Sequence, residues 1–297
     1  MRRIQQLLCL LALVVLPAWA ADEHNYLVGR GTADVTGPAL GVQLWGFGRP
    51  DQIGEGIHIR QHARAFVIAQ RDVPQQRLAF VSVDLGSIEH HLTLAVVEQL
   101  QSRYGETYRL DNVIISATHT HACPGGYWHS RSDAGLDGGF YPEHFDALVD
   151  SLASAIVAAH EDLAPGTIQI NAGRVENAGV NRSRVAYLEN PAAERARYLE
   201  DTNKGMTLLK FTRDEGAIGL INWYALHPTA MNYYNRLISG DHKGYASLTM
   251  EQALGARPGD FVAAFAQADP GDVTPNTNLD NTGPGATDVE TTQIMGE

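Results

Sequence analysis

Cysteine is nearly missing from this chain of 297 residues, which carries only Cys9 and Cys123. We expect Cys9 to be removed with an N-terminal leader, so that Cys123 has no partner and no intrachain disulfide forms. Basic residues are also scarce, because 22 lysines and arginines face 34 aspartates and glutamates, for a net charge of −12. This deficit argues against nucleic-acid binding, which needs basic patches, and against tight electrostatic binding to an anionic membrane.

The first twenty residues have the pattern of a cleaved signal peptide. Arg2 and Arg3 form a positive segment, the apolar stretch Leu7–Leu16 follows, and Ala18-Trp19-Ala20 is a small-x-small cleavage site. Ten apolar residues are too few to cross a bilayer as a helix. We expect cleavage after Ala20 and a secreted or periplasmic protein, whose net charge becomes −14 once the two leader arginines are lost.

Residues 21–297 form one predicted domain, because no composition shift or linker divides them. Hydrophobic content of 44% and charged content of 19% are ordinary for a globular protein. The sequence runs through Thr287–Glu297 without a clear stop signal or charged tail. We therefore expect it to be the N-terminal part of a longer catalytic domain, truncated at its C-terminus.

Apolar and β-branched runs alternate with helix-like segments along the chain. The predicted strands are His62–Gln70, Arg77–Asp84, Asn112–Thr118, Thr167–Ala172, Met206–Thr212, Ala217–Tyr224 and Phe261–Gln267. The predicted helices are Ser87–Tyr104, Pro142–Asp162 and Gly244–Leu254. This order predicts an α/β fold with a mixed, partly parallel sheet flanked by helices, and an active site at the strand ends.

Two histidines, His119 and His121, directly follow the apolar run that starts at Ile114. Side chains alternate across a strand, so residues two apart share a face, and we expect both imidazoles to point the same way. Neutral imidazole is a common metal ligand and proton carrier near pH 7. The spacing alone does not separate this interpretation from one core histidine and one solvated histidine.

Three other segments place polar residues after apolar runs, and each also has a plain explanation. His227 follows Trp223-Tyr224 and is compatible with a simple strand cap. Arg182 has the character of a surface charge, and Thr274 precedes a proline as a turn residue would. Taken together, they suggest a metal held by His119 and His227 with a hydroxyl nearby.

These motifs together resemble the N-terminal catalytic part of the neutral/alkaline (non-lysosomal) ceramidases. The resemblance extends over almost all of residues 25–297, and many ordered blocks carry it. They are Gly56–Phe66, Val83–Gly86, Ala117–His121 with Pro124–Gly126, Asn181–Ser183, His227 with Thr229 and Met231, Lys243–Ser247, and Gly271–Asn276.

The resemblance implies zinc-dependent (Zn2+) cleavage of the N-acyl bond of ceramide, or a similar N-acyl lipid, to sphingosine and a fatty acid. By position, His119 and His227 match the zinc ligands, and His121 and Arg182 match an active-site histidine and arginine. Thr274 stands where the family usually has a serine, the proposed nucleophile. The family's other zinc ligands, a glutamate and a tyrosine, fall beyond residue 297.

Two departures from the family pattern keep alternatives open. Threonine at 274 keeps the hydroxyl but adds a methyl group that stiffens the side chain. Ala122-Cys123 replaces the usual Ser-Gly, so Cys123 is either a zinc-binding thiolate or a small buried thiol. The alternatives are a related zinc hydrolase acting on another amide or ester, and an exported lipid-binding homologue without catalysis. The sequence leaves transient contact with a membrane surface and the oligomeric state open.

Overall fold

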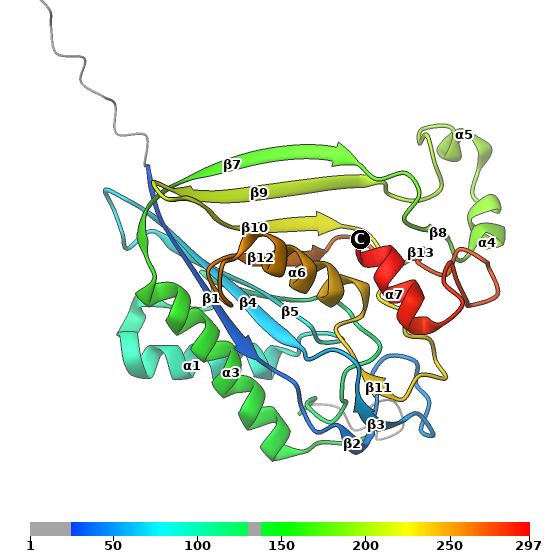
Figure 1. Cartoon of the computed structure of the whole chain (residues 1–297), viewed down its shortest axis with the longest axis horizontal. Coiled ribbons are helices and arrows are strands. Elements are labelled where there is room, and N and C mark those ends of the chain that lie inside the picture. Colours follow the sequence, from blue (N-terminus) through cyan, green and yellow to red (C-terminus); the bar gives the residue numbers. More distant parts are fainter. Residues whose placement is uncertain (1–24, 130–137) are drawn as a thin grey trace, which may run out of the picture.

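A computed structural model describes residues 25–129 and 138–297. Its main feature is an eight-stranded sheet with the strand order β12-β10-β9-β7-β1-β4-β5-β6 (Figure 1). The pairs β5–β6 and β10–β12 are parallel, and the other neighbours are antiparallel. Helices pack against this sheet. The expected α/β fold with a mixed, partly parallel sheet is therefore confirmed, whereas the expected signal peptide lies outside the described residues.

The strands of the large sheet include every strand expected from the sequence. They are β1 (Tyr26–Asp34), β4 (His62–Gln70), β5 (Arg77–Val83), β6 (Val113–Ala117), β7 (Ala164–Arg174), β9 (Gly205–Arg213), β10 (Gly216–Tyr224) and β12 (Val262–Gln267). Two small sheets use β2 (Leu40–Gln43), β3 (Ile53–Ile57) and β11 (Leu237–Ile238), and β8 (Val180–Asn181) with β13 (Val273–Thr274). The helices are α1 (His90–Tyr104), η1 (Gly105–Thr107), α3 (Pro142–Glu161), α4 (Arg184–Leu188), α5 (Ala192–Arg195), α6 (Asp241–Leu254) and α7 (Asp288–Gly296).

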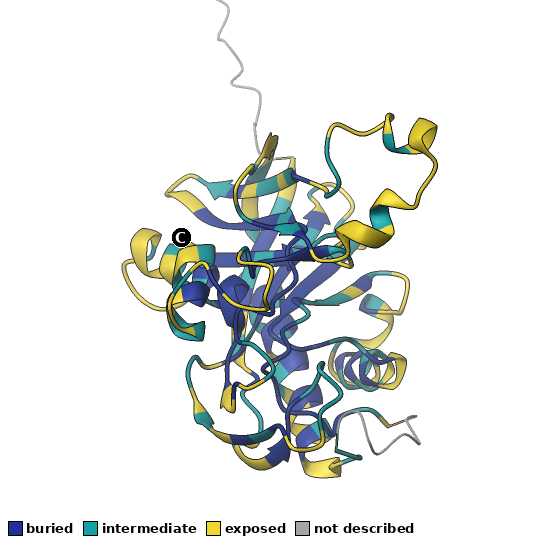
Figure 2. Cartoon of the chain, turned by 90° about the vertical axis from the view of Figure 1, so that its right-hand side faces the viewer, coloured by how far each residue is buried: buried dark blue, intermediate teal, exposed yellow. Residues whose placement is uncertain are grey.

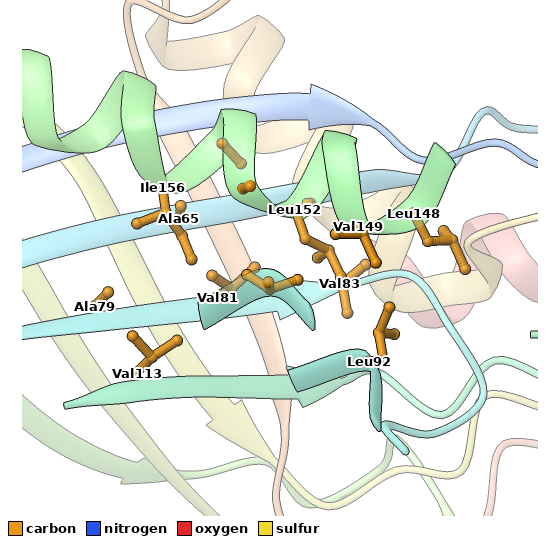
Figure 3. Packing of buried hydrophobic residues seen from close by; sticks show 14 of the residues in the cluster. Ala65, Ala79, Val81, Val83, Leu92, Val113, Leu148, Val149, Leu152 and Ile156 are labelled. Carbon is orange, nitrogen blue, oxygen red and sulfur yellow. The ribbon is translucent and has the colours of Figure 1, made fainter. Parts of the chain in front are cut away.

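One face of strands β4, β5 and β6 is covered by α3 and α1. Alternate residues of these strands point toward the helices, as the period of two requires. Figure 3 shows the resulting contact, in which apolar side chains of α3 meet small and branched residues of the sheet. The labelled members are Ala65, Ala79, Val81, Val83, Leu92, Val113, Leu148, Val149, Leu152 and Ile156. Replacing one fully buried leucine of such a core by alanine lowers the free energy of unfolding by about 2–5 kcal/mol.

The opposite face of β4 and β5 packs against the other half of the same sheet. Phe66 of β4 stacks on Phe211 of β9 with ring centroids 4.7 Å apart, and Phe80 of β5 meets Trp223 of β10 at 5.4 Å. The sheet therefore folds over on itself, so that β12 at one edge lies close to β4, β5 and β6. Figure 2 shows the buried residues concentrated in this interior. Beyond it, α6 covers the outer face of β10 and β12.

Strand β1 was not predicted, although it lies at the centre of the sheet. Its sequence contains Gly29 and Gly31, and glycine disfavours a strand assignment by pattern. Both glycines lie against α3, where an added Cβ would come within 2.0 Å of the Ala159 carbonyl oxygen and 2.3 Å of that of Ala155. The missing side chains let the helix backbone approach the strand, which explains the glycines.

The predicted element ends differ slightly from the structure where polar residues lie. Helix α1 begins at His90 rather than Ser87, and α6 begins at Asp241 rather than Gly244. Strand β6 ends at Ala117, before the histidine pair. In the described ranges, none of the helices combines the length and apolar character needed to span a bilayer.

Candidate metal centre

The histidine pair lies in a turn after β6, so the expected strand geometry is wrong. His119 has a φ of 73°, a left-handed conformation that is uncommon for residues other than glycine. The backbone N–H of His119 donates to the Leu85 carbonyl at 2.9 Å, which ties the turn to the end of β5. Backbone strain of this kind is concentrated at functional sites. The two imidazoles thus converge through a turn and not through the pleat of a strand.

His227 follows β10 and completes a three-histidine cluster. The Nε2 atom of His121 lies 3.0 Å from the Nε2 atom of His227 and 3.5 Å from that of His119. One ring nitrogen from each histidine lies within 4.8 Å of the others, and in the described part of the chain no other such group fits a metal ion. A tetrahedral zinc site separates its nitrogen ligands by about 3.3 Å, because each Zn–N bond is about 2.0–2.1 Å. The cluster therefore has suitable dimensions for a metal ion.

Backbone carbonyls fix the orientation of two of the three rings. The Nδ1–H of His119 donates to the Gly86 carbonyl at 2.7 Å, and the Nδ1–H of His227 donates to the Pro270 carbonyl at 3.1 Å. These bonds select the tautomer in which each Nε2 carries a lone pair. An orienting acceptor on the outer nitrogen is typical of metal-binding histidines, so His119 and His227 fit zinc in chemistry and orientation.

Burial keeps the cluster neutral. Removal from water lowers the pKa of His119, lowers the pKa of His227 to about 4 and lowers that of His121 to about 2. Mutual repulsion between the rings and the nearby positive charge of Arg182 lower the His121 pKa further. All three imidazoles are therefore unprotonated near pH 7 and keep their lone pairs for a ligand or a proton.

Packing rather than hydrogen bonding holds the outer, Nδ1 side of the His121 ring. Its Nδ1 is buried without a hydrogen-bond partner. The rings of Phe47 and Trp45 meet it edge-on, with centroids 4.5 and 5.6 Å away. Gly46 lies between these two aromatics, and a Cβ there would approach the imidazole to 2.5 Å. This aromatic loop confines His121 but does not fix its tautomer.

Thr274 ends one of two short paired strands beside the cluster, and Arg182 directly follows the other. Strand β8 pairs with β13 through Val180 and Thr274, and Arg182 follows β8 directly. Arg182 is exposed, its Nε donates to the Gly271 carbonyl at 3.0 Å, and its charge lowers the pKa of each clustered histidine. Thr274 is buried, and its Oγ1 accepts from the Asn276 N–H at 3.2 Å.

A backbone bond joins this strand pair to the histidine cluster. The His227 N–H donates to the carbonyl of Val273, the neighbour of Thr274, at 3.3 Å. The structure thus gathers all five residues predicted from the sequence in one region. It brings the three histidines into direct contact, and it places Thr274 on the adjoining β8–β13 pair and Arg182 directly after β8.

Cys123 is a buried thiol and not a candidate ligand. Its Sγ lies 3.7 Å from the Thr120 carbonyl, toward which the thiol donates. Burial raises the pKa of this thiol to about 12, and Cys123 is not among the residues whose ligand atoms converge in the histidine cluster. Of the two interpretations left open by the sequence, the small core thiol agrees with this environment.

Several residues that shape the cluster were not found by sequence reasoning. Gly86 supplies the carbonyl for His119, and a Cβ at Gly86 would lie 2.0 Å from the ring of Trp45. Pro270 supplies the corresponding carbonyl for His227. Carbonyl groups leave no trace in a sequence pattern, but a glycine three residues after the end of β5 is a signal that the backbone is closely approached there.

The fold and the cluster define an α/β protein with a candidate three-histidine metal centre at the ends of its strands. The model of the neutral/alkaline non-lysosomal ceramidase N-terminal domain matches residues 26–293. The chain belongs to this family.

Similar proteins from distant organisms bear names of the same kind. A neutral ceramidase of Oryza sativa subsp. japonica is 45% identical over 82% of this chain, and one of Drosophila pseudoobscura pseudoobscura is 38% identical over 97%. The crystal structure of a neutral ceramidase from Pseudomonas aeruginosa is 38% identical, covers 93% of this chain and superposes with a TM-score of 0.85. The chain spans 31%, 45% and 43% of these three proteins, respectively, which is less than half of each.

Proposed function

We propose that the protein carrying this chain hydrolyses the N-acyl bond of ceramide, or of a similar N-acyl lipid, with zinc as its metal. Family membership supports the reaction class. The observation that carries the metal is the convergence of the Nε2 atoms of His119 and His227, whose outer nitrogens are both oriented by carbonyls. Imidazole nitrogen is a preferred ligand of zinc.

The proposed zinc ligands in this chain are His119 and His227. Two protein ligands do not complete a catalytic site, which usually has three, and the resemblance places further ligands beyond residue 297. Zinc bound there would act as a Lewis acid toward the amide carbonyl and so favour attack on it.

The chain's own residues then have distinct tasks. Thr274 offers a hydroxyl as the nucleophile, and neutral His121 accepts its proton and returns it to the leaving amine. The acyl group is then an ester of Thr274, and water hydrolyses this ester to release the fatty acid and restore the hydroxyl. The guanidinium of Arg182 stabilises the negative charge that develops on the substrate oxygen. The buried and unpaired Nδ1 of His121 supports this assignment over that of a third ligand, because metal-binding histidines almost always donate the second nitrogen's proton to an acceptor.

The remaining parts of the proposal concern location and specificity. We propose export through the signal-like segment 1–20, to the periplasm or the medium, and transient contact with a membrane surface that presents the lipid. Threonine at 274 favours one further candidate, a zinc hydrolase of the same fold acting on a less bulky amide or ester, because the added methyl crowds the acyl carbon. Comparing long-chain ceramide with short acyl amides as substrates separates these two functions.

Metal analysis of the full-length protein tests the proposal. Wild-type protein is expected to contain about one zinc per chain and to release fatty acid from ceramide. His119→Ala and His227→Ala variants are expected to lose both the metal and the activity. The control is His144→Asn, which changes a buried histidine of α3 outside the cluster. Stoichiometric zinc in either of the first two variants would refute the ligand assignment.

A further inference from the structure

The two proposed zinc ligands are carried by strands that are not neighbours in the sheet. His119 follows β6, which forms one edge, whereas His227 follows β10, which is next to the edge strand β12 at the other end. Folding of the sheet over itself brings these strand ends together. The separation of the two imidazoles therefore depends on contacts between the two halves of the sheet.

Gln267, the last residue of β12, bridges the two strand ends with its side-chain amide. Its Nε2 donates to the Thr118 carbonyl at 2.9 Å and to the Leu226 carbonyl at 2.9 Å. Its Oε1 accepts from the Leu226 N–H at 3.2 Å. Thr118 immediately precedes His119, and Leu226 immediately precedes His227. One planar group thus joins the residues directly before the two ligands.

We propose that Gln267 is a positioning residue that sets the separation of His119 and His227 for metal binding. This inference rests on the proposed zinc site. A second link lies on the far side of the histidines, where the His121 N–H donates to the Pro228 carbonyl at 3.2 Å. Gln267 joins the residues that precede the two ligands in the chain, and the His121–Pro228 bond joins residues that follow them. The two contacts together fix the turn that holds the cluster.

The chemistry of the bridge requires an amide with the reach of glutamine. Two N–H donors and one acceptor are used, and all three lie on one rigid plane. A carboxylate has no donors and would face two carbonyl oxygens, whereas an aliphatic side chain would leave the Thr118 and Leu226 carbonyls without this donor. Asparagine keeps the amide but is one methylene shorter. The register of β12, in which Gln267 lies opposite Tyr224, places the amide at the level of the strand ends.

Zinc affinity and the visible spectrum of bound Co2+ test the inference in the full-length protein. We expect Gln267→Met to weaken zinc binding about 10- to 100-fold, the range found for residues that orient metal ligands, and to shift the Co2+ absorption bands. The matched control is Gln52→Met. Gln52 is also buried and donates its Nε2 to a backbone carbonyl, that of Asn235 at 2.9 Å, but it joins no histidine-bearing strand ends. The control is expected to leave zinc affinity within about threefold and the spectrum unchanged, since it removes only structural hydrogen bonds, to the carbonyls of Asn235 and Asn232.

A folded Gln267→Met protein with wild-type zinc affinity and an unchanged Co2+ spectrum would overturn the inference. If Gln267→Met does not fold, Gln267→Asn decides the question by the same two measurements, because it keeps a polar group but lacks the reach. Equal losses of affinity in the Gln267 and Gln52 variants would also overturn it, since they would indicate a general effect of stability. Zinc binding that survives His119→Ala would instead refute the proposed metal site itself.

Discussion

The Nε2 atom of His121 lies 3.0 Å from the Nε2 atom of His227, and the two rings differ in what holds their other nitrogen. The Nδ1–H of His227 donates to the Pro270 carbonyl, whereas the Nδ1 of His121 has no partner. In the tautomer with its proton on Nε2, His121 donates toward a neighbouring lone pair. Because no acceptor holds a proton on Nδ1, the Nε2 of His121 can either carry a proton or take one up at the centre of the cluster, as an acid–base group must.

His121→Phe separates these two roles. Phenylalanine keeps the ring between Phe47 and Trp45 and removes both nitrogens. We expect zinc content to stay close to stoichiometric and ceramide turnover to fall about 100-fold or more, the usual effect of losing a positioned acid–base group. Metal analysis and turnover measurements on the same preparation provide the check. Zinc loss as complete as that of His227→Ala would make His121 a ligand and contradict the assignment.

Gly86→Ala should damage the cluster by steric overlap. The new Cβ would lie 2.0 Å from the Trp45 ring, so either this ring, which packs on His119, or the backbone that supplies the His119 acceptor must shift. We expect a loss of about 1–3 kcal/mol in unfolding free energy from overpacking, and zinc affinity weaker by about tenfold or more. Urea unfolding and chelator competition measure the two effects. The control is Gly173→Ala, where an added Cβ meets nothing within 4 Å; similar losses at both positions would refute the steric explanation.

The end of β5 is anchored by a buried ion pair. Asp84 accepts from the guanidinium of Arg64 at 3.0 Å and from the His62 N–H at 3.0 Å, and both charged side chains are almost fully buried. Asp84→Asn leaves the Arg64 charge with Glu251 alone, so we expect a loss of about 3 kcal/mol in unfolding free energy. Glu55→Gln breaks the exposed pair with Arg236 and should cost less than about 1 kcal/mol. Urea denaturation of both variants tests the contrast, and equal costs would contradict it.

The local sequence pattern predicted most of the large sheet but not how its halves meet. Strand β4 was predicted with its exact ends, because His62–Gln70 is rich in apolar and β-branched residues between polar segments. Strand β1 was missed because Gly29 and Gly31 serve the close approach of α3 rather than strand propensity. Periodicity describes neighbours along the chain, whereas the overlap of β12 with β4, β5 and β6 depends on long-range packing.

The candidate site was predicted by residue type and by resemblance, and only in part by geometry. His119 and His121 were expected to converge because they are two apart on a strand, yet β6 ends at Ala117 and a left-handed turn at His119 brings them together. His227 is 106 residues beyond His121, and the spacing of the residues carries no information about their 3.0 Å contact. The carbonyl groups that orient the His119 and His227 rings could not be predicted either, because Gly86 and Pro270 are also distant from these rings in the sequence.

Acid should destabilise the metal-free protein through His144. Burial lowers the pKa of this imidazole from 6.5 to about 4, while its Nδ1–H donates to the Gly125 carbonyl at 3.1 Å. Because the folded pKa lies below the unfolded pKa, the unfolded chain binds the extra proton as the pH falls, and stability present above pH 6.5 is lost toward pH 4. For this histidine alone, the expected loss between pH 7.5 and pH 5 is about 2 kcal/mol.

His144→Asn isolates this contribution. Asparagine keeps a donor for the Gly125 carbonyl but does not titrate in this range. Urea unfolding of both proteins at pH 7.5 and pH 5 gives the measurement, and the wild-type protein should lose about 2 kcal/mol more than the variant on acidification. Identical losses in the two proteins would show that other groups carry the acid sensitivity.

The role of Thr274 is decided by its hydroxyl. The side chain is buried at the end of β13, and its Oγ1 accepts from the Asn276 N–H at 3.2 Å, which orients the oxygen in the turn. Thr274→Val keeps the branched shape and removes that oxygen, so packing is nearly controlled, although the swap is not strictly isosteric. If the hydroxyl attacks the amide, valine should lower turnover of ceramide about 100-fold or more in the full-length protein while the zinc content stays the same.

Thr274→Ser is the matched partner of this experiment. Serine keeps the hydroxyl and loses the methyl group, so activity should persist, and any crowding by the methyl should be relieved as a higher rate on long-chain ceramide. Turnover of ceramide and of a short acyl amide by the three proteins, each with its zinc content measured, gives the comparison. A valine variant that matches the wild-type rate would mean that a solvent molecule is the nucleophile. Thr274 would then serve only the turn, in which its oxygen accepts the Asn276 N–H.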